Sequence, residues 1–207
     1  MTKAEKQREI EFLNIVKQRC FDNNVRLELI NRSKILYWRD IYIGGYFLDQ
    51  QNGTGILSCA TKNKFFLSTL VHEYSHMEQW IEETEIWTNS RHIADLDDWL
   101  AGETIRDIEN KINKIKLLEL DCEKRSIKNI KKYNLPIDLV EYTKKANAYL
   151  LFHNYLKITR NWGKPTNSPI STKNKNIWEK CPSKIMPESY YDVIPKKILN
   201  EFIISKI

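Results

Sequence analysis

The sequence predicts a mixed α+β protein that is mostly helical and carries one small antiparallel sheet. Apolar residues recur at alternating spacings of three and four over residues 105–126, which is the period of a buried helix face. Two short β-type runs, at 42–48 and 55–60, flank a turn that contains Asn-Gly. A chain of 207 residues can bury a sizeable core. We therefore expect one domain over residues 1–160 and an extension over residues 161–207 that packs on it.

The first elements follow from hydrophobic periodicity. Lys3–Cys20 predicts an amphipathic helix, and Val25–Ile30 predicts a strand. Inward-facing positions of this helix are expected at Ile10, Leu13 and Val16. Tyr42–Leu48 and Gly55–Ala60 predict a hairpin whose edge strand could pair with an extended substrate. The hairpin could equally serve only as scaffold.

The segment after the hairpin, Leu70–Met77, reads Leu-Val-His-Glu-Tyr-Ser-His-Met and contains an HExxH pattern. On a helix, His72 and His76 would lie on one face about 6 Å apart, so that two ring nitrogens could hold one tetrahedral Zn²⁺. Glu73 would then stand beside the metal as the general base for a metal-activated water. The alternative is a pair of histidines on a helix surface. Glu78 stands where the extended pattern usually has an apolar residue.

A catalytic zinc needs a third protein donor. The metzincin continuation is absent, because Gln79 and Glu82 occupy the positions of its glycine and histidine. The next apolar stripe consists of Ile105, Ile108, Ile112, Ile115, Glu119, Cys122 and Ser126. Because a buried carboxylate is costly unless it is paired or metal-bound, Glu119 is the predicted third ligand. Glu123, one turn later, is predicted to hold a ligand histidine. Alternatively, the side chain of Glu119 extends to solvent at the edge of the apolar stripe, or it pairs with a basic residue.

These two motifs together resemble a known pair. HEYSH followed by Glu-Leu-Asp-Cys-Glu at 119–123 is similar to the HExxH and ExxxD motifs of gluzincin-type metallopeptidases, over two helices of the chain. The resemblance implies a small zincin-like lobe, one zinc ion and hydrolysis of a peptide or protein substrate. It assigns His72, His76 and Glu119 as ligands, Glu73 as the base and Glu123 in place of the commoner Asp. The motifs and the Lys/Asn/Ile-rich composition also resemble small phage-encoded metallopeptidase-like proteins, which implies the host cytoplasm.

Two later regions add candidates. Residues 83–104 interrupt the helical pattern and are expected to form a lid or specificity insertion. This region carries possible rival ligands, which are otherwise solvated polar residues: His92, Asp95, Asp97 and Asp98. A helix is expected from Pro136 to about Arg160. On it, Tyr149 and His153 could stabilise an oxyanion, or could be a core tyrosine and a packed histidine.

The C-terminal region, 161–207, is punctuated by prolines and is expected to be extended chain ending in a short helix over Pro195–Ile204. Its apolar anchors are expected to be Trp178, Met186, Tyr190, Tyr191 and Ile194. The formal charge is +6, with lysines concentrated over 124–200. That distribution permits a nucleic-acid partner or a DNA-associated protease, but a solvated surface is the favoured interpretation.

Composition excludes other classes. No apolar run approaches the ~20 residues that span a bilayer. The polar N-terminus predicts no secretory signal. The four cysteines, Cys20, Cys59, Cys122 and Cys181, are scattered without a CxxC pair, so reduced thiols in a cytoplasm are expected. A catalytically inactive zincin-like scaffold that binds metal and serves as an interaction protein remains the alternative to an enzyme.

Overall fold

The chain folds into two compact units. The computed structural model describes residues 2–38, 41–50, 52–89, 93–162 and 167–207. Unit 1 comprises residues 1–84 and 122–138, and unit 2 comprises residues 85–121 and 139–207. In unit 2 the C-terminal region packs with side chains of two long helices. The expected boundary at residue 160 stays a prediction.

Unit 1 is built on a three-stranded sheet with strand order β1-β5-β4. Strands β4 (Gly45–Asp49) and β5 (Gly55–Ala60) pair antiparallel, which confirms the predicted hairpin. In its turn, Gly53 has a φ of 75°, a conformation that glycine adopts at little steric cost. Strand β1 (Val25–Ile30) pairs with β5 in parallel, so the sheet is mixed and the expectation of a purely antiparallel sheet is corrected. The reason is topological, since the chain between β1 and β5 returns to the same end of the sheet.

The expected strand over residues 42–48 is divided in two. Its first part is β3 (Ile41–Ile43), which pairs antiparallel with β2 (Ile35–Trp38) in a separate ribbon. Strand β4 then begins at Gly45, where a Cβ would lie 2.7 Å from Cγ2 of Thr69 and 2.8 Å from the carbonyl of Ser58. A glycine is needed there because the strand approaches its neighbours too closely for a side chain.

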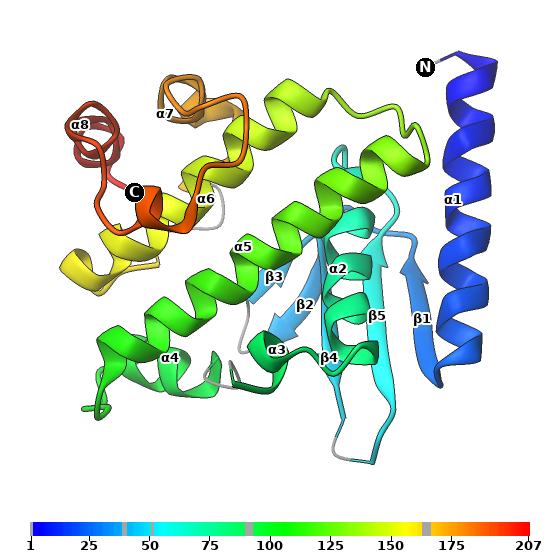
Figure 1. Cartoon of the computed structure of the whole chain (residues 1–207), viewed down its shortest axis with the longest axis horizontal. Helices are drawn as coiled ribbons and strands as arrows, with labels where there is room; N and C mark the ends of the chain where they lie inside the picture. The colour runs from blue at the N-terminus through cyan, green and yellow to red at the C-terminus, as the bar shows by residue number, and fades with distance from the viewer. Residues whose placement is uncertain (1, 39–40, 51, 90–92, 163–166) are drawn as a thin grey trace. The chain divides into compact units, whose positions relative to one another are not determined.

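Two helices pack with this sheet in unit 1. Helix α2 (Phe66–Ile81) contacts β4 and β5, and helix α1 (Lys3–Asp22) contacts β1 (Figure 1). Helix α1 begins with a capping box between Thr2 and Glu5. Its buried positions are Phe12, Val16 and Cys20, whereas Ile10 is 43% exposed, so the predicted inward face was wrong at Ile10. The buried stripe is narrow because it repeats at every fourth residue.

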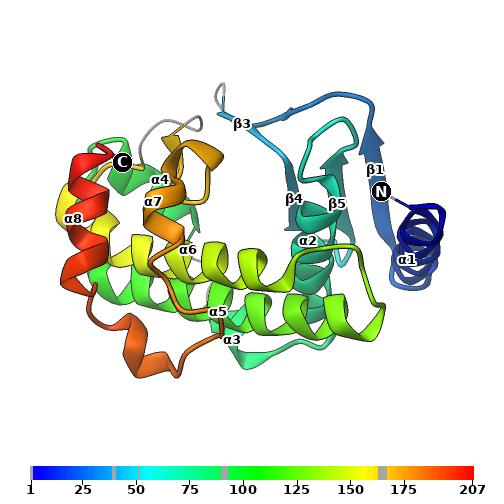
Figure 2. The ribbon, with the colours of Figure 1, turned by 90° about the horizontal axis from the view of Figure 1, so that it is seen from above.

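Unit 2 is helical. Residues expected to form an irregular insertion contain helices α3 (Glu85–Asn89) and α4 (Ile93–Leu100). The long helices are α5 (Ile108–Lys132), whose second half belongs to unit 1, and α6 (Leu139–Thr159). Helix α6 lies close to its predicted bounds, whereas α5 continues beyond the predicted stripe over 105–126. The C-terminal region adds α7 (Lys175–Trp178), 3-10 turns at Thr172–Asn174 and Glu188–Tyr191, and α8 (Lys196–Ile204). Figure 2 shows α7 and α8 beside α6.

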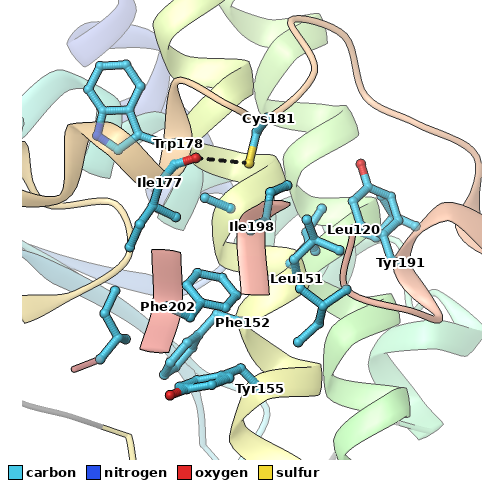
Figure 3. Close-up of a cluster of buried hydrophobic side chains, with 14 residues drawn as sticks. Leu120, Leu151, Phe152, Tyr155, Ile177, Trp178, Cys181, Tyr191, Ile198 and Phe202 are labelled. Atoms are coloured by element: carbon cyan, nitrogen blue, oxygen red, sulfur yellow. Dashed lines mark hydrogen bonds between the residues drawn. The ribbon is translucent and has the colours of Figure 1, made fainter. Parts of the chain in front are cut away.

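The core of unit 2 gathers side chains from α6 and the C-terminal region (Figure 3). The predicted anchors are confirmed, because Trp178, Tyr191 and Ile194 are buried while Met186 and Tyr190 pack partly buried against them. Polar groups fix the same segment: Nζ of Lys116 donates to the carbonyl of Tyr191 over 2.8 Å, and Nδ2 of Asn154 donates to that same oxygen. The two buried donors, Nζ of Lys116 and Nδ2 of Asn154, thus share one acceptor, as the cost of burying an unpaired donor requires.

Together the two units confirm the predicted class, a mostly helical α+β protein with small sheets. Over the residues that the structure describes, no helix combines the length and apolar character needed to cross a bilayer.

Candidate metal centre

Helix α2 presents both histidines of the HExxH pattern on one face. Its residues 66–81 contain neither glycine nor proline, and its buried apolar side chains are Leu70, Val71, Tyr74 and Met77. This burial fixes the rotation of the helix and so the direction of the polar positions between them. The imidazole rings of His72 and His76 lie 4.8 Å apart between centroids, at an interplanar angle of 89°.

Each histidine is held at Nδ1 by an oxygen of another side chain. Nδ1 of His76 lies 2.8 Å from Oε1 of Gln79, and Nδ1 of His72 lies 3.2 Å from Oε1 of Glu123. The contact between Glu123 and a histidine of the motif is the one that the sequence predicts. Metal-binding histidines usually donate their second ring N–H to such an oxygen, which leaves Nε2 as the coordinating nitrogen.

Cys122 also lies at this site. Its Sγ is 3.6 Å from Nδ1 of His72 and donates to the carbonyl of His72 over 3.4 Å. Potential ligand atoms of His72, His76 and Cys122 all lie within 4.8 Å of one another. From the sequence, Cys122 is predicted to be an apolar core position. The signal for its place at the site is that Cys122 shares a helix face with Glu119, three residues earlier.

The electrostatics of His72 favour its charged form. Burial disfavours the imidazolium, but the neighbouring Cys122 and Glu123 outweigh that effect and raise the pKa of His72 well above its usual value. Oε2 of Glu123 is buried and has no hydrogen-bond partner within the part of the chain that the structure describes. A metal ion at Nε2 would replace the proton and keep a positive charge beside Glu123.

Polar contacts lock α2 against the second half of α5 within unit 1. Ser126 donates to Oγ of Ser75 over 3.0 Å, and Nδ2 of Asn129 donates to Oε2 of Glu78 over 2.8 Å. At the helix end, Arg125 pairs with Glu82 at 2.7 Å. These contacts fix the register that brings Cys122 and Glu123 to His72, and they explain why Glu78 is charged where an apolar residue was expected.

Glu73, the predicted base, is 9% exposed. The pKa of Cys59 in β5 is raised, first by burial and then by the charge of Glu73. The negative charge of Glu73 therefore acts on the thiol of Cys59 in β5, the central strand of the sheet. The role of Glu73 as general base stays a prediction.

Glu119 belongs to unit 2, where it is 8% exposed. Its charge acts on His153, since it favours the imidazolium of that residue. Its role as third metal ligand stays a prediction.

His153 is fully buried in unit 2 and packs against Tyr149. Its Nδ1 lies 3.1 Å from the carbonyl of Tyr149, and the two rings meet edge to face at 4.9 Å. Burial lowers the pKa of His153, although Glu119 opposes this, and its Nε2 has no hydrogen-bond partner among the described residues. This is the geometry of the packed histidine; a role for Tyr149 or His153 in stabilising an oxyanion stays a prediction.

The rival ligands are dispersed. His92 lies outside the described residues. Asp95 pairs with Lys111 at 3.1 Å in unit 2, and Asp97 and Asp98 follow it in helix α4. Asp95 is thus a paired surface carboxylate, and a lid function of residues 83–104 stays a prediction.

Comparisons with family models, with curated proteins and with solved structures find no match to this chain.

Proposed function

We propose that this chain is a zinc-dependent hydrolase that cleaves peptide bonds. The supporting observation concerns the two motif histidines. Nδ1 of each lies within hydrogen-bonding distance of an oxygen of a buried side chain. Two surface histidines on a structural helix have no need of such partners. The arrangement is typical of imidazoles that present Nε2 to a metal.

The residues at the site fit a zinc ion. Imidazole nitrogen, thiolate and carboxylate are the donors that zinc takes in proteins. His72 and His76 would supply two nitrogens, and the predicted third donor is Glu119. Cys122 is the further donor that unit 1 offers, but its sulfur lies beside Nδ1 of His72, the side that Glu123 also occupies. We therefore assign Cys122 to the surroundings of His72 and keep Glu119 as the proposed ligand.

When bound, zinc would supply a Lewis acid that polarises a carbonyl and lowers the pKa of water towards ~7. The chain's own groups do the rest of the chemistry. Glu73 would accept the proton of the attacking water and pass it to the leaving amine. Glu123 would hold the ring of His72 in place and balance charge as the reaction proceeds. That the cleaved bond is a peptide bond follows from the resemblance to gluzincin-type metallopeptidases.

The test is the Glu73→Gln variant compared with wild type at equal zinc loading. Both proteins are incubated with casein and with a peptide library, and new amino termini are counted. We expect the variant to keep its zinc and its fold while the rate falls by ~10²–10⁴, because an amide cannot accept the proton. Glu83→Gln, in the turn after helix α2, serves as a control that should keep full activity.

Two results would overturn the proposal. Full activity in Glu73→Gln would exclude this mechanism. A wild type that holds zinc but cleaves neither casein nor any library peptide would instead support the inactive zincin-like scaffold.

A further inference from the structure

The geometry points to Gln79 as the positioning residue of His76. We infer that its side-chain oxygen holds His76 in the tautomer that carries its proton on Nδ1, so that Nε2 is ready to bind a metal. The inference rests on the proposed metal centre for its purpose, but the tautomer is a property of the metal-free protein. It gives a role to a residue that the HExxH pattern itself does not include.

The contact is short and buried. Oε1 of Gln79 lies 2.8 Å from Nδ1 of His76; Gln79 is fully buried and His76 is 8% exposed. An amide oxygen can only accept a hydrogen bond, so Nδ1 must be the donor. In this low-dielectric setting the alternative tautomer would leave an acceptor facing an acceptor, which is costly.

The backbone of Gln79 is fixed by the end of helix α2. The amide of Thr84 donates to the carbonyl of Gln79 over 3.2 Å, and the amide of Glu83 donates to the carbonyl of Trp80 over 3.0 Å. Glu83 takes a positive φ of 47°. This is the Schellman pattern of helix termination. The side chain that contacts His76 thus comes from a residue whose backbone is fixed by hydrogen bonds, one helical turn after the histidine.

The two histidines are held by different chemistry. His72 faces the carboxylate of Glu123, which comes from helix α5, whereas His76 faces a neutral amide of its own helix. A second carboxylate would add a negative charge to a buried site that already contains Glu73 and Glu123. A neutral acceptor fixes the ring without that charge, and it does so independently of how α5 packs.

The experiment measures the histidine tautomers directly. Long-range ¹H–¹⁵N correlation spectra are recorded on the metal-free, uniformly ¹⁵N-labelled protein at a pH where His76 is neutral. In wild type we expect His76 to carry its proton on Nδ1. In Gln79→Met, which keeps a similar length without the acceptor, the signals should move towards a mixture of tautomers. Gln79→Glu keeps an acceptor at this position and should keep the proton of His76 on Nδ1.

Glu123→Gln is the matched control, since it alters the partner of the other histidine. It should change the His72 signals and leave those of His76 in place. Zinc affinity, measured by competition with a chelator, should fall ~10–100-fold in Gln79→Met and recover in Gln79→Glu.

The inference is overturned if wild-type His76 carries its proton on Nε2, or if Gln79→Met leaves the His76 signals unchanged. If Gln79→Met does not fold, the wild-type spectrum still tests the inference, because a proton on Nε2 of His76 overturns it. The readout does not depend on hydrolysis. A protein without peptidase activity could still show the predicted tautomer, so failure of the proposed function and failure of this inference are distinguishable.

Discussion

Nδ2 of Asn129 in helix α5 donates a hydrogen bond of 2.8 Å to Oε2 of Glu78 in helix α2. Glu78 is the residue two positions after His76, and it stands where the extended HExxH pattern usually has an apolar side chain. Its charge is therefore part of the helix interface. Asn129 also lies 3.4 Å from Oγ of Ser75, so one amide joins two successive turns of the motif helix.

Loss of this amide should destabilise the protein. Because a hydrogen bond to a charged group contributes about 1.5–3 kcal/mol, Asn129→Ala should lower the free energy of unfolding by about that amount. Urea denaturation followed by circular dichroism measures it. In a double-mutant cycle with Glu78→Gln, the two effects should be non-additive, because the residues share one contact. Additive effects would show that the contact contributes nothing.

The identity of the third metal donor can be read from metal content. His76→Ala and Glu119→Ala should both lose the single zinc ion, whereas Cys122→Ser should keep it with reduced affinity. Elemental analysis of the purified proteins, with equal protein concentrations, gives the stoichiometry. Full zinc in both His76→Ala and Glu119→Ala would defeat the ligand assignment. Loss of zinc in Cys122→Ser together with retention in Glu119→Ala would make the cysteine the third ligand.

Glu123 should support a ligand without being one. Its Oε1 lies 3.2 Å from Nδ1 of His72, so Glu123→Gln should weaken zinc binding ~10–100-fold while one ion per chain still binds at saturation. Titration against a chromophoric chelator measures both quantities. A variant that binds no zinc at any concentration would place Glu123 directly on the metal.

His153 should make the protein less stable in acid. Its pKa is lowered in the fold, chiefly by burial, whereas in the unfolded chain it takes up a proton near pH ~6.5. Below that pH the unfolded state binds more protons, so stability falls as the pH drops from ~6.5 towards the folded pKa, by at most about 1.4 kcal/mol per pH unit.

The comparison is with His153→Gln, which should show a flatter pH dependence over the same range. Urea midpoints of both proteins, without metal, supply the measurement. The charges that act on His153 in unit 2 are Glu119 and Lys116, and both are retained. His72, whose raised pKa has the opposite effect, is also present in both proteins. Parallel curves would show that His153 does not titrate with unfolding.

The sequence by itself determined the long helices, the motif helix and strands β1 and β5, but not the ribbon of β2 and β3 or the short helices α3 and α4. Strand β1 lies at Val25–Ile30 as predicted, and helix α8 covers most of the predicted Pro195–Ile204. Local spacing was sufficient, because helix and strand periodicity depend only on neighbours along the chain. The same spacing predicted that Glu123 would reach a histidine of the motif.

Tertiary structure decided which groups share a site and in which direction chains pair. The parallel partner of β5 could not be read from the hairpin, since it comes from a strand 30 residues earlier in register. Cys122 became a neighbour of His72 only because contacts such as Ser75 with Ser126 fix the helix register. Gln79 is visible in the sequence, but its role depends on burial: the same amide in water would exchange partners freely, whereas a buried one must keep its partner.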